Sequence, residues 1–213
     1  GDGQSYSYVR DRGTLMASNI RAVTRTRSYT VTRGALGVDA SQKPSLWWIY
    51  DDAGTTLAYD QPLPVVDGGP SMTPSRTNPT DAIVWSDNYS GVGGAPVLVR
   101  DGRMCFDYLK TSISTYKSNY EMLQGDIFAD GLRAPRTAIG YTPDGKVVIM
   151  VVDGRNAGGS RGVTLDELAR LMMGVGCDNV LNLDGGGSSM MCVTNDGTLL
   201  NTPSDGQQRA VLA

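Results

Sequence analysis

The sequence contains no histidine, and its 213 residues include only 3 cysteines and 2 phenylalanines. Without histidine, the chain has no Ser-His-Asp or Cys-His nucleophile, no histidine-ligated zinc site and no histidine general base. Acid–base chemistry must therefore fall to aspartate, glutamate, tyrosine, lysine or cysteine. The three cysteines are too few for a disulfide scaffold and lack the spacing of a metal site. We expect them to be buried thiols, with a single bridge as the alternative.

The chain also lacks an excess of positive charge and a long apolar run. Its net charge is −3 and its pI is about 4.9, so it has no basic surplus for binding nucleic acid. No segment approaches the roughly 18 apolar residues that a membrane-spanning helix needs. The chain shows no signal peptide and begins abruptly at Gly1, so we expect a targeting segment to have been removed.

Glycine is abundant, with 27 residues, and a composition this rich in glycine and tyrosine suits strands joined by turns. Several apolar runs end in turn signals such as Asp-Gly, which predicts β-hairpins. Residues 107–130 are polar, as is typical of a surface insertion. The sequence therefore predicts an α+β (mixed α/β) fold: a mixed β-sheet with a strand–helix–strand crossover, several β-hairpins and few helices. We expect a single domain over residues 1–213.

The strand–helix–strand segment, 147–183, makes the most specific structural prediction. Its first strand, 147–152, is apolar on both faces, which is typical of a central buried strand. Thr164 and Glu167 form a capping box at the start of the helix, whose apolar residues keep helical spacing. Strands joined by such a crossover run parallel and end at the same edge of the sheet. Asp153 and Asp184 follow the two strands, so we expect both carboxylates to face one crevice.

Asp184 is followed by three glycines and two serines, Gly185–Ser189, which lie between two apolar segments. We expect a strand, a tight glycine turn and a second strand over 190–193, because consecutive glycines favour positive φ or close backbone approach. A row of exposed N–H groups in this turn could hold an anion. If the hairpin that follows folds back by its own length, Asp205 comes near Asp184. The alternative is a plain turn with independent turn aspartates.

Five motifs stand in one order along the chain: Arg136–Gly140, Asp153–Arg155, Gly162–Ala169, Leu183–Ser189 and Pro203–Gly206. In this order they resemble the phosphodiester glycosidase family. Residues 131–209 match densely, and 31–39 and 91–102 match more loosely. Two features depart from the family: an opening stretch similar to Asn-Gly-Gly-Phe-Phe is missing, and the last strand is shortened. We therefore expect the domain to lack its N-terminal segment.

The resemblance implies a hydrolase that cleaves the glycosidic bond of a sugar 1-phosphodiester, such as an N-acetylglucosamine 1-phosphodiester, releasing free sugar and a phosphomonoester. Asp184 is the first candidate for the nucleophile or base, with Asp205 and Asp153 as its partners. The serines are expected to hydrogen-bond rather than attack, because no histidine can activate them. Substrate and phosphate binding is expected from Arg136, Arg155, Gly185, Gly186, Gly187, Ser188, Ser189, Ser204, Arg209, Gly93 and Gly94.

The resemblance further implies a bacterial-type, extracytoplasmic protein whose partner is a small sugar-phosphate molecule or a glycan. It implies no cofactor and no bound metal, and no oligomeric state is predicted. Two alternatives stay open. The three aspartates could hold Mg²⁺ or Ca²⁺ through oxygen ligands in a metal-dependent phosphodiesterase. The missing opening motif also fits a non-catalytic module that binds glycans or assists envelope polysaccharide assembly.

Overall fold

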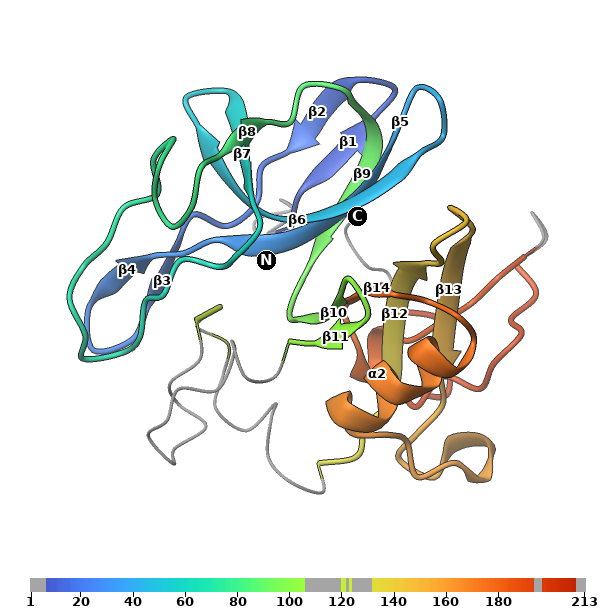
Figure 1. Cartoon of the computed structure of the whole chain (residues 1–213). Coiled ribbons are helices and arrows are strands. Elements are labelled where there is room, and N and C mark those ends of the chain that lie inside the picture. Colours follow the sequence, from blue (N-terminus) through green and yellow to red (C-terminus); the bar gives the residue numbers. More distant parts are fainter. Residues whose placement is uncertain (1–6, 106–119, 122, 124–131, 194–196, 210–213) are drawn as a thin grey trace.

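Two β-sheets pack against each other, and a helix covers the outer face of the smaller sheet (Figure 1). The structure is a computed structural model that describes residues 7–105, 120–121, 123, 132–193 and 197–209. Strands dominate and helix is scarce, so the predicted α+β class is confirmed. None of the helices in the described residues is long and apolar enough to cross a membrane.

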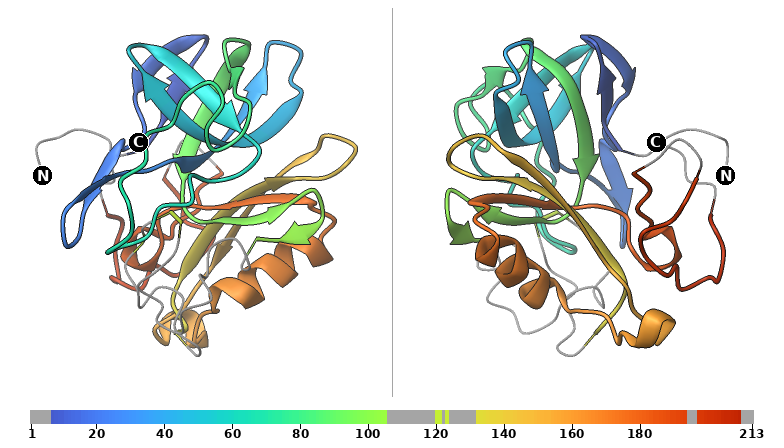
Figure 2. Two further views of the ribbon diagram at one scale, coloured as in Figure 1. Left: turned by 60° about the vertical axis from the view of Figure 1, so that its left-hand side comes forward. Right: turned by 90° about the vertical axis from the view of Figure 1, so that its right-hand side faces the viewer.

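The larger sheet has seven strands and is strongly curled (Figure 2). All its neighbouring strands are antiparallel. In spatial order they are β2 (Thr14–Ala17), β1 (Val9–Asp11), β9 (Asn88–Gly94), β5 (Arg33–Asp39), β6 (Pro44–Asp52), β7 (Thr55–Tyr59) and β8 (Ile83–Val84). A separate hairpin joins β3 (Ala22–Thr24) and β4 (Ser28–Thr30).

The smaller sheet has five strands and carries the crossover that the sequence predicts. In spatial order they are β11 (Arg103–Met104), β10 (Val97–Arg100), β14 (Asn179–Asn182), β12 (Arg136–Tyr141) and β13 (Val147–Val152). β13 and β14 both run antiparallel to β12, so they point in the same direction. Their common direction is as predicted, but β12 lies between them and every hydrogen-bonded pair is antiparallel.

The main hydrophobic core lies on both faces of the five-stranded sheet. One face meets the seven-stranded sheet through Leu36, Leu46 and Trp48, and the other meets the helix α2 (Leu165–Gly174). Burial of these apolar side chains stabilises the fold by roughly 25 cal/mol per Å² of apolar surface removed from water. This burial holds the three layers together. Glycine permits a close approach of the two sheets, since a Cβ on Gly34 would lie 2.5 Å from Leu181 Cδ1.

Helix α2 begins where the sequence predicts. The Thr164 side chain accepts a hydrogen bond from the N–H of Glu167 (3.2 Å), and the Glu167 carboxylate accepts one from the N–H of Thr164 (3.0 Å). The reciprocal pair satisfies two N–H groups that the first turn leaves free. Gly176, with φ of 95°, follows the helix and ends it.

The strand β13 differs from the prediction. It is the edge strand of its sheet, with Val147 and Ile149 exposed, rather than a central strand buried on both faces. The reason is strand order: β12 pairs with β14 on its other side, so β13 has a single neighbour among the described strands. The cysteines also differ in part. They form no disulfide among the described residues, and Cys105 and Cys177 are buried, but Cys192 is exposed.

Candidate functional site

Three of the predicted site residues meet at one edge of the five-stranded sheet. β13 and β14 end at the edge where β12 begins, because both run antiparallel to β12. Arg136, the first residue of β12, pairs with Val152 at the end of β13. This edge therefore carries Asp153 after β13, Arg136 at the start of β12 and Asp184 just beyond β14.

The glycine loop, defined here as residues 184–189, is not the hairpin turn that the sequence predicts. Gly186–Ser188 forms a 3₁₀ turn, and residues 190–193 form no strand. In that stretch Cys192 makes one isolated bridge to Leu199. The chain after the loop is held by this bridge, by a backbone hydrogen bond from the Leu200 N–H to the Met191 carbonyl (2.9 Å) and by the Asn201 side chain, rather than by a continuous strand ladder.

The loop's backbone N–H groups are largely taken. The N–H of Gly185 donates to Asp184 Oδ1 (2.9 Å), and the N–H of Gly186 donates to the Pro135 carbonyl (2.9 Å). Of the three glycines, at most Gly187 keeps an N–H for a ligand. The expected row of N–H groups does not form, so an anion at this loop would be bound mainly by side chains, with at most the Gly187 N–H from the glycine backbone.

Asp184 is exposed, and only its Oδ1 has a partner among the described residues, the N–H of Gly185. Its other oxygen is therefore available to a ligand. A carboxylate with one oxygen fixed and one free is oriented without being neutralised, which suits a nucleophile or a base.

Asp205 comes to the same loop, at Gly187. A Cβ on Gly187 would lie 2.2 Å from Asp205 Oδ2 and 2.4 Å from Oδ1, so only glycine lets this carboxylate approach so closely. Asp205 also forms an ion pair with Arg209, which in turn lies 3.5 Å from the Ser188 hydroxyl through Nη1. Asp205 therefore lies against the glycine loop at Gly187. The turn of the hairpin that was expected to bring it near Asp184 lies partly outside the described residues, but the antiparallel bridge between Cys192 and Leu199 shows that the chain does fold back there.

Arg155 also lies against the loop, at Gly186. A Cβ on Gly186 would lie 3.2 Å from Arg155 Nη2, so the guanidinium rests against the loop backbone. Arg155 is exposed and adopts φ of 56°, and the next residue, Asn156, adopts φ of 66°. Non-glycine residues rarely adopt this left-handed conformation. Where the surrounding structure requires it, the residue often lies at a functional site.

Arg136 is buried beneath the loop rather than displayed on it. Its Nε donates to the Val163 carbonyl and its Nη2 to the Leu132 carbonyl, both at 3.3 Å. Gly185 packs over its Cα and Cδ. Burial lowers the pKa of the Arg136 guanidinium, because the charged form has lost solvent. Within the described part of the chain no carboxylate pairs with it, so it supplies positive charge under the loop.

Asp153 is occupied on both oxygens. Oδ1 accepts from Asn201 Nδ2 (2.8 Å) and Oδ2 accepts from the N–H of Thr202 (3.0 Å). Its carboxylate therefore faces the segment 201–209, named here the C-terminal strap, which also carries Asp205 and Arg209. The edge position of Asp153 is as predicted, but its bonds point to the strap.

The remaining predicted residues lie away from the exposed surface of the loop. Ser189 is buried, and its hydroxyl contacts Thr137 Oγ1 at 3.2 Å. The hydroxyl of Ser204 is also buried and has no partner among the described residues. In β9, Gly93 packs on Tyr8 and Gly94 on the backbone of Asn182, where they allow the two sheets and their neighbours to approach.

No group of three or more His, Cys, Asp or Glu side chains in the described residues is arranged to hold a metal ion. Asp153, Asp184 and Asp205 instead each have different partners. The donor set expected for Mg²⁺ or Ca²⁺ is therefore not assembled in this part of the chain.

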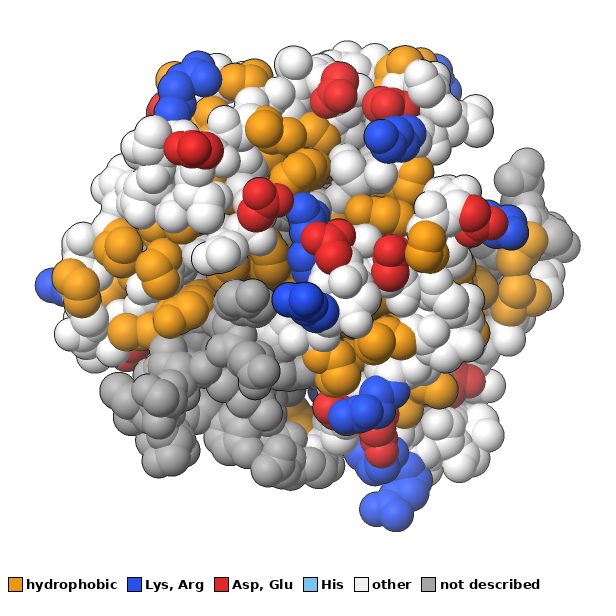
Figure 3. Space-filling view, in the orientation of Figure 1, with side chains coloured by type: hydrophobic (Ala, Val, Ile, Leu, Met, Phe, Trp, Pro, Cys, Tyr) orange, Lys and Arg blue, Asp and Glu red, His pale blue; other side chains and the backbone are white. Residues whose placement is uncertain are grey.

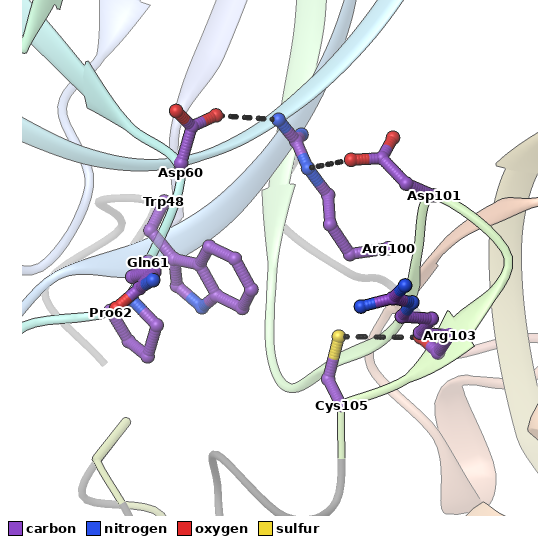
Figure 4. A pocket seen from close by; sticks show the side chains of 8 residues that line it. All are labelled: Trp48, Asp60, Gln61, Pro62, Arg100, Asp101, Arg103 and Cys105. Carbon is purple, nitrogen blue, oxygen red and sulfur yellow. Dashed lines mark hydrogen bonds and ion pairs between the residues drawn. The ribbon is translucent and has the colours of Figure 1, made fainter.

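A separate cleft of about 450 Å³ lies between the two sheets, at the end of β14 opposite the glycine loop (Figure 4). Arg100 spans it, pairing with Asp60 (3.1 Å) and Asp101 (3.4 Å), and it stacks over the Trp47 ring at 4.5 Å. The floor, which includes Trp48 and Cys105, is almost fully buried. These contacts join one sheet to the other, so we assign the cleft to the architecture rather than to the site.

Charge is mixed over the face that Figure 3 shows. Among the residues coloured by type there, acidic and basic side chains alternate without a broad region of one sign.

Two polar residues that bond to distant parts of the chain, the partly buried Asn201 and the buried Glu121, were missed by the sequence analysis. Asn201 makes side-chain bonds to Asp153, to the Ser189 carbonyl (2.9 Å) and from the Met191 N–H (2.8 Å). Glu121 was expected in a surface insertion but is fully buried, accepting from Trp48 Nε1 (2.8 Å). No local pattern marks either residue, because their partners are distant in the sequence.

Comparison with known proteins identifies a family. The family model described as phosphodiester glycosidase matches residues 49–212, well over half of the chain. The uncharacterized SPbeta prophage-derived protein YomE of Bacillus subtilis is 44% identical over 81 residues, which are 38% of this chain and 12% of that protein. Bovine N-acetylglucosamine-1-phosphodiester alpha-N-acetylglucosaminidase is 40% identical over 70 residues, 33% of this chain and 12% of the enzyme.

Among solved structures, the catalytic domain of zebrafish N-acetylglucosamine-1-phosphodiester alpha-N-acetylglucosaminidase has a similar fold. The TM-score is 0.57 at 18% identity, and the alignment covers 92% of this chain and 50% of that one. At this identity the likeness concerns the fold alone. The chain thus matches about half of the zebrafish chain and a small part of the two curated relatives.

Proposed function

The chain belongs to the phosphodiester glycosidase family, and from this premise we propose that it hydrolyses the glycosidic bond of a sugar 1-phosphodiester. The products would be the free sugar and a phosphomonoester. An N-acetylglucosamine 1-phosphodiester is the proposed substrate, since the bovine relative is named for that activity. The observation that carries the proposal is an exposed Asp184 with one free oxygen, on a loop that two guanidinium groups contact.

The chemistry favours this arrangement. A phosphate is already a good leaving group, so the reaction depends less on a strong general acid than ordinary glycoside cleavage does. Its needs are positive charge around the phosphate and a carboxylate at the anomeric carbon. Arg155 contacts the glycine loop at Gly186 and Arg209 contacts it at Ser188. Together they supply the charge, because guanidinium binds phosphate with two parallel hydrogen bonds.

The three aspartates have different surroundings, and these suggest different roles. Asp184, with a free oxygen, is the proposed nucleophile or base. Asp205 pairs with Arg209 and so orients a guanidinium toward the phosphate. Arg136 stays buried and acts through its charge beneath the loop. Ser188 lies beside Arg209 and is the serine best placed to hydrogen-bond a ligand.

The test uses UDP-N-acetylglucosamine and a methylphospho-sugar as substrates for the wild type and for Asp184→Asn. Asp166→Asn is the matched control, because Asp166 pairs only with Arg170 on the exposed face of α2. We expect the wild type and Asp166→Asn to release free sugar, and Asp184→Asn to lose at least about 10³-fold in kcat/KM. Release of sugar 1-phosphate, or unchanged turnover in Asp184→Asn, contradicts the proposal.

We further propose that the domain is of bacterial type, acts outside the cytoplasm and needs no metal. Similarity to a Bacillus subtilis protein supports the first point. Metal independence is tested with EDTA: turnover should survive the treatment. Loss of turnover in EDTA, with restoration by Mg²⁺ or Ca²⁺, would contradict the proposal.

A further inference from the structure

We infer that Asp153 is a positioning residue that fixes the C-terminal strap over the glycine loop, and that it takes no part in proton transfer or attack. The kinetic effects expected of this role rest on the proposed function. The structural role itself rests on the hydrogen bonds alone.

The first step is that both oxygens of the carboxylate are engaged by the strap. Asp153 Oδ1 and Oδ2 each accept one hydrogen bond from the strap, from Asn201 Nδ2 at 2.8 Å and from the Thr202 N–H at 3.0 Å. Hydrogen bonds to an ionised group are about twice as strong as neutral ones. A carboxylate whose oxygens are both directed at protein donors is poorly placed to attack a substrate as well.

The second step is the support of Asp153 itself. Its backbone carbonyl accepts a hydrogen bond from the Ser160 hydroxyl at 2.6 Å. Gly158 packs against the contact, since a Cβ there would lie 3.3 Å from both Asp153 Oδ2 and Thr202 Oγ1. The loop after β13 therefore holds the carboxylate in the direction of the strap.

The third step is the link to the glycine loop. Asn201 donates to the Ser189 carbonyl at 2.9 Å and accepts from the Met191 N–H at 2.8 Å, so one amide ties the strap to the chain leaving the loop. Farther along the strap, Asp205 rests on Gly187 and pairs with Arg209. Displacing residue 201 would therefore displace the guanidinium proposed to bind phosphate.

The kinetic test is a double-mutant cycle with Asp153→Asn, Asn201→Ala and the double variant. The amide that Asp153→Asn introduces has one acceptor oxygen, and its NH₂ group faces one of the two strap donors, Asn201 Nδ2 or the Thr202 N–H. Each single variant therefore loosens the same contact between the loop after β13 and the strap. We expect each to lower kcat/KM about 10- to 100-fold. The kcat/KM of the double variant should lie within about threefold of that of the less active single variant, because the effects of coupled residues do not add. Multiplied losses would overturn the inference.

The pH dependence separates positioning from proton transfer. In Asp153→Asn we expect the acidic limb of the profile of kcat/KM against pH to keep its midpoint while its height falls. Disappearance of that limb in Asp153→Asn would make Asp153 the base and overturn the inference. Asp166→Asn, whose carboxylate lies on the exposed face of α2, serves as the control in each measurement.

A measurement without substrate tests the inference separately. Hydrogen exchange at the Thr202 amide should accelerate in Asp153→Asn at least about tenfold, while amides within α2 keep their wild-type rates. An unchanged Thr202 rate, or equal acceleration throughout the chain, overturns the positioning role. If the wild type hydrolyses no sugar phosphodiester, the proposed function fails, and the exchange measurement still decides the role of Asp153.

Discussion

At the scale of single residues, the site depends on how close side chains come to the glycine backbone. Gly187 is in contact with the Asp205 carboxylate, and Gly186 with the Arg155 guanidinium. The sequence predicted that the glycines allow an anion to approach. In the structure, the absence of Cβ atoms instead lets the Asp205 carboxylate and the Arg155 guanidinium contact the loop. These charged groups are then available to a ligand.

Gly187→Ala should therefore damage the site more than the fold. The new methyl group would meet Asp205 at about the position of its carboxylate, so Asp205 and Arg209 must move. We expect kcat/KM to fall about 100-fold or more, with Gly174→Ala as the control, since nothing lies within 4 Å of a Cβ at Gly174. Wild-type kinetics in Gly187→Ala would show that the Asp205 contact is unimportant.

Arg155 should show a conflict between stability and activity. Its φ of 56° is unfavourable for a residue with a Cβ and costs roughly 1 kcal/mol, which glycine at this position avoids. We expect Arg155→Gly to unfold in urea at the wild-type concentration or higher, while kcat/KM falls about 100-fold. A variant that is both destabilised and fully active would refute the role assigned to this side chain.

At the scale of elements, local signals succeeded where contacts are local. The capping box at Thr164 and Glu167 was predicted correctly, because neighbouring residues decide it. The exposed edge position of β13 was not predicted, because the sequence of an apolar strand does not distinguish the centre of a sheet from its edge. Its place depends on β12 pairing with both crossover strands, which is a long-range choice.

The capping box makes a prediction of its own. Thr164→Ala removes the acceptor of the Glu167 N–H and should lower the free energy of unfolding by about 1 kcal/mol. Because α2 packs on the face of the sheet and not at the glycine loop, kcat/KM should stay within about twofold of wild type. Urea unfolding and steady-state kinetics on the same preparation check both parts, and Thr164→Ser should keep the cap.

At the scale of the whole molecule, two charged side chains, the partly buried Arg100 and the buried Glu121, join the two sheets. Arg100 of β10 reaches Asp60, which follows β7, and covers Trp47 of β6. Glu121 accepts from Trp48 Nε1 of one sheet and from the N–H of Val97 (3.0 Å) of the other. Neither junction could be predicted from the sequence, since charged residues in turns and insertions are ordinarily solvated.

Glu121 should make stability depend on pH. Burial raises its pKa above the ordinary value of 4.5, although the positive charge of Arg33 opposes the shift. A raised folded-state pKa contributes stability that is fully present below about pH 4.5 and is lost as pH rises through the folded pKa. Glu121→Gln, which keeps an acceptor for Trp48 and Val97, should flatten this decline in urea unfolding between about pH 5 and 8. Equal slopes for both proteins would contradict the assignment.

The sequence predicted where the candidate residues lie better than it predicted their surroundings. Asp153, Asp184 and Arg136 do meet at one sheet edge, because strand direction alone brings them there. Their different surroundings come from the strap, whose course is set by Asn201 and by contacts remote in the chain. Sequence patterns predict which residues gather, and the hydrogen bonds indicate how their roles divide.

The central claim is that water attacks the sugar carbon and not the phosphorus. Hydrolysis of UDP-N-acetylglucosamine in ¹⁸O-labelled water, followed by mass spectrometry of the products, tests this most directly. The account predicts that the label enters the released N-acetylglucosamine and is absent from UDP when turnover is stopped early, before sugar oxygen exchange. Label in UMP or in sugar 1-phosphate would show cleavage at phosphorus and would contradict the account.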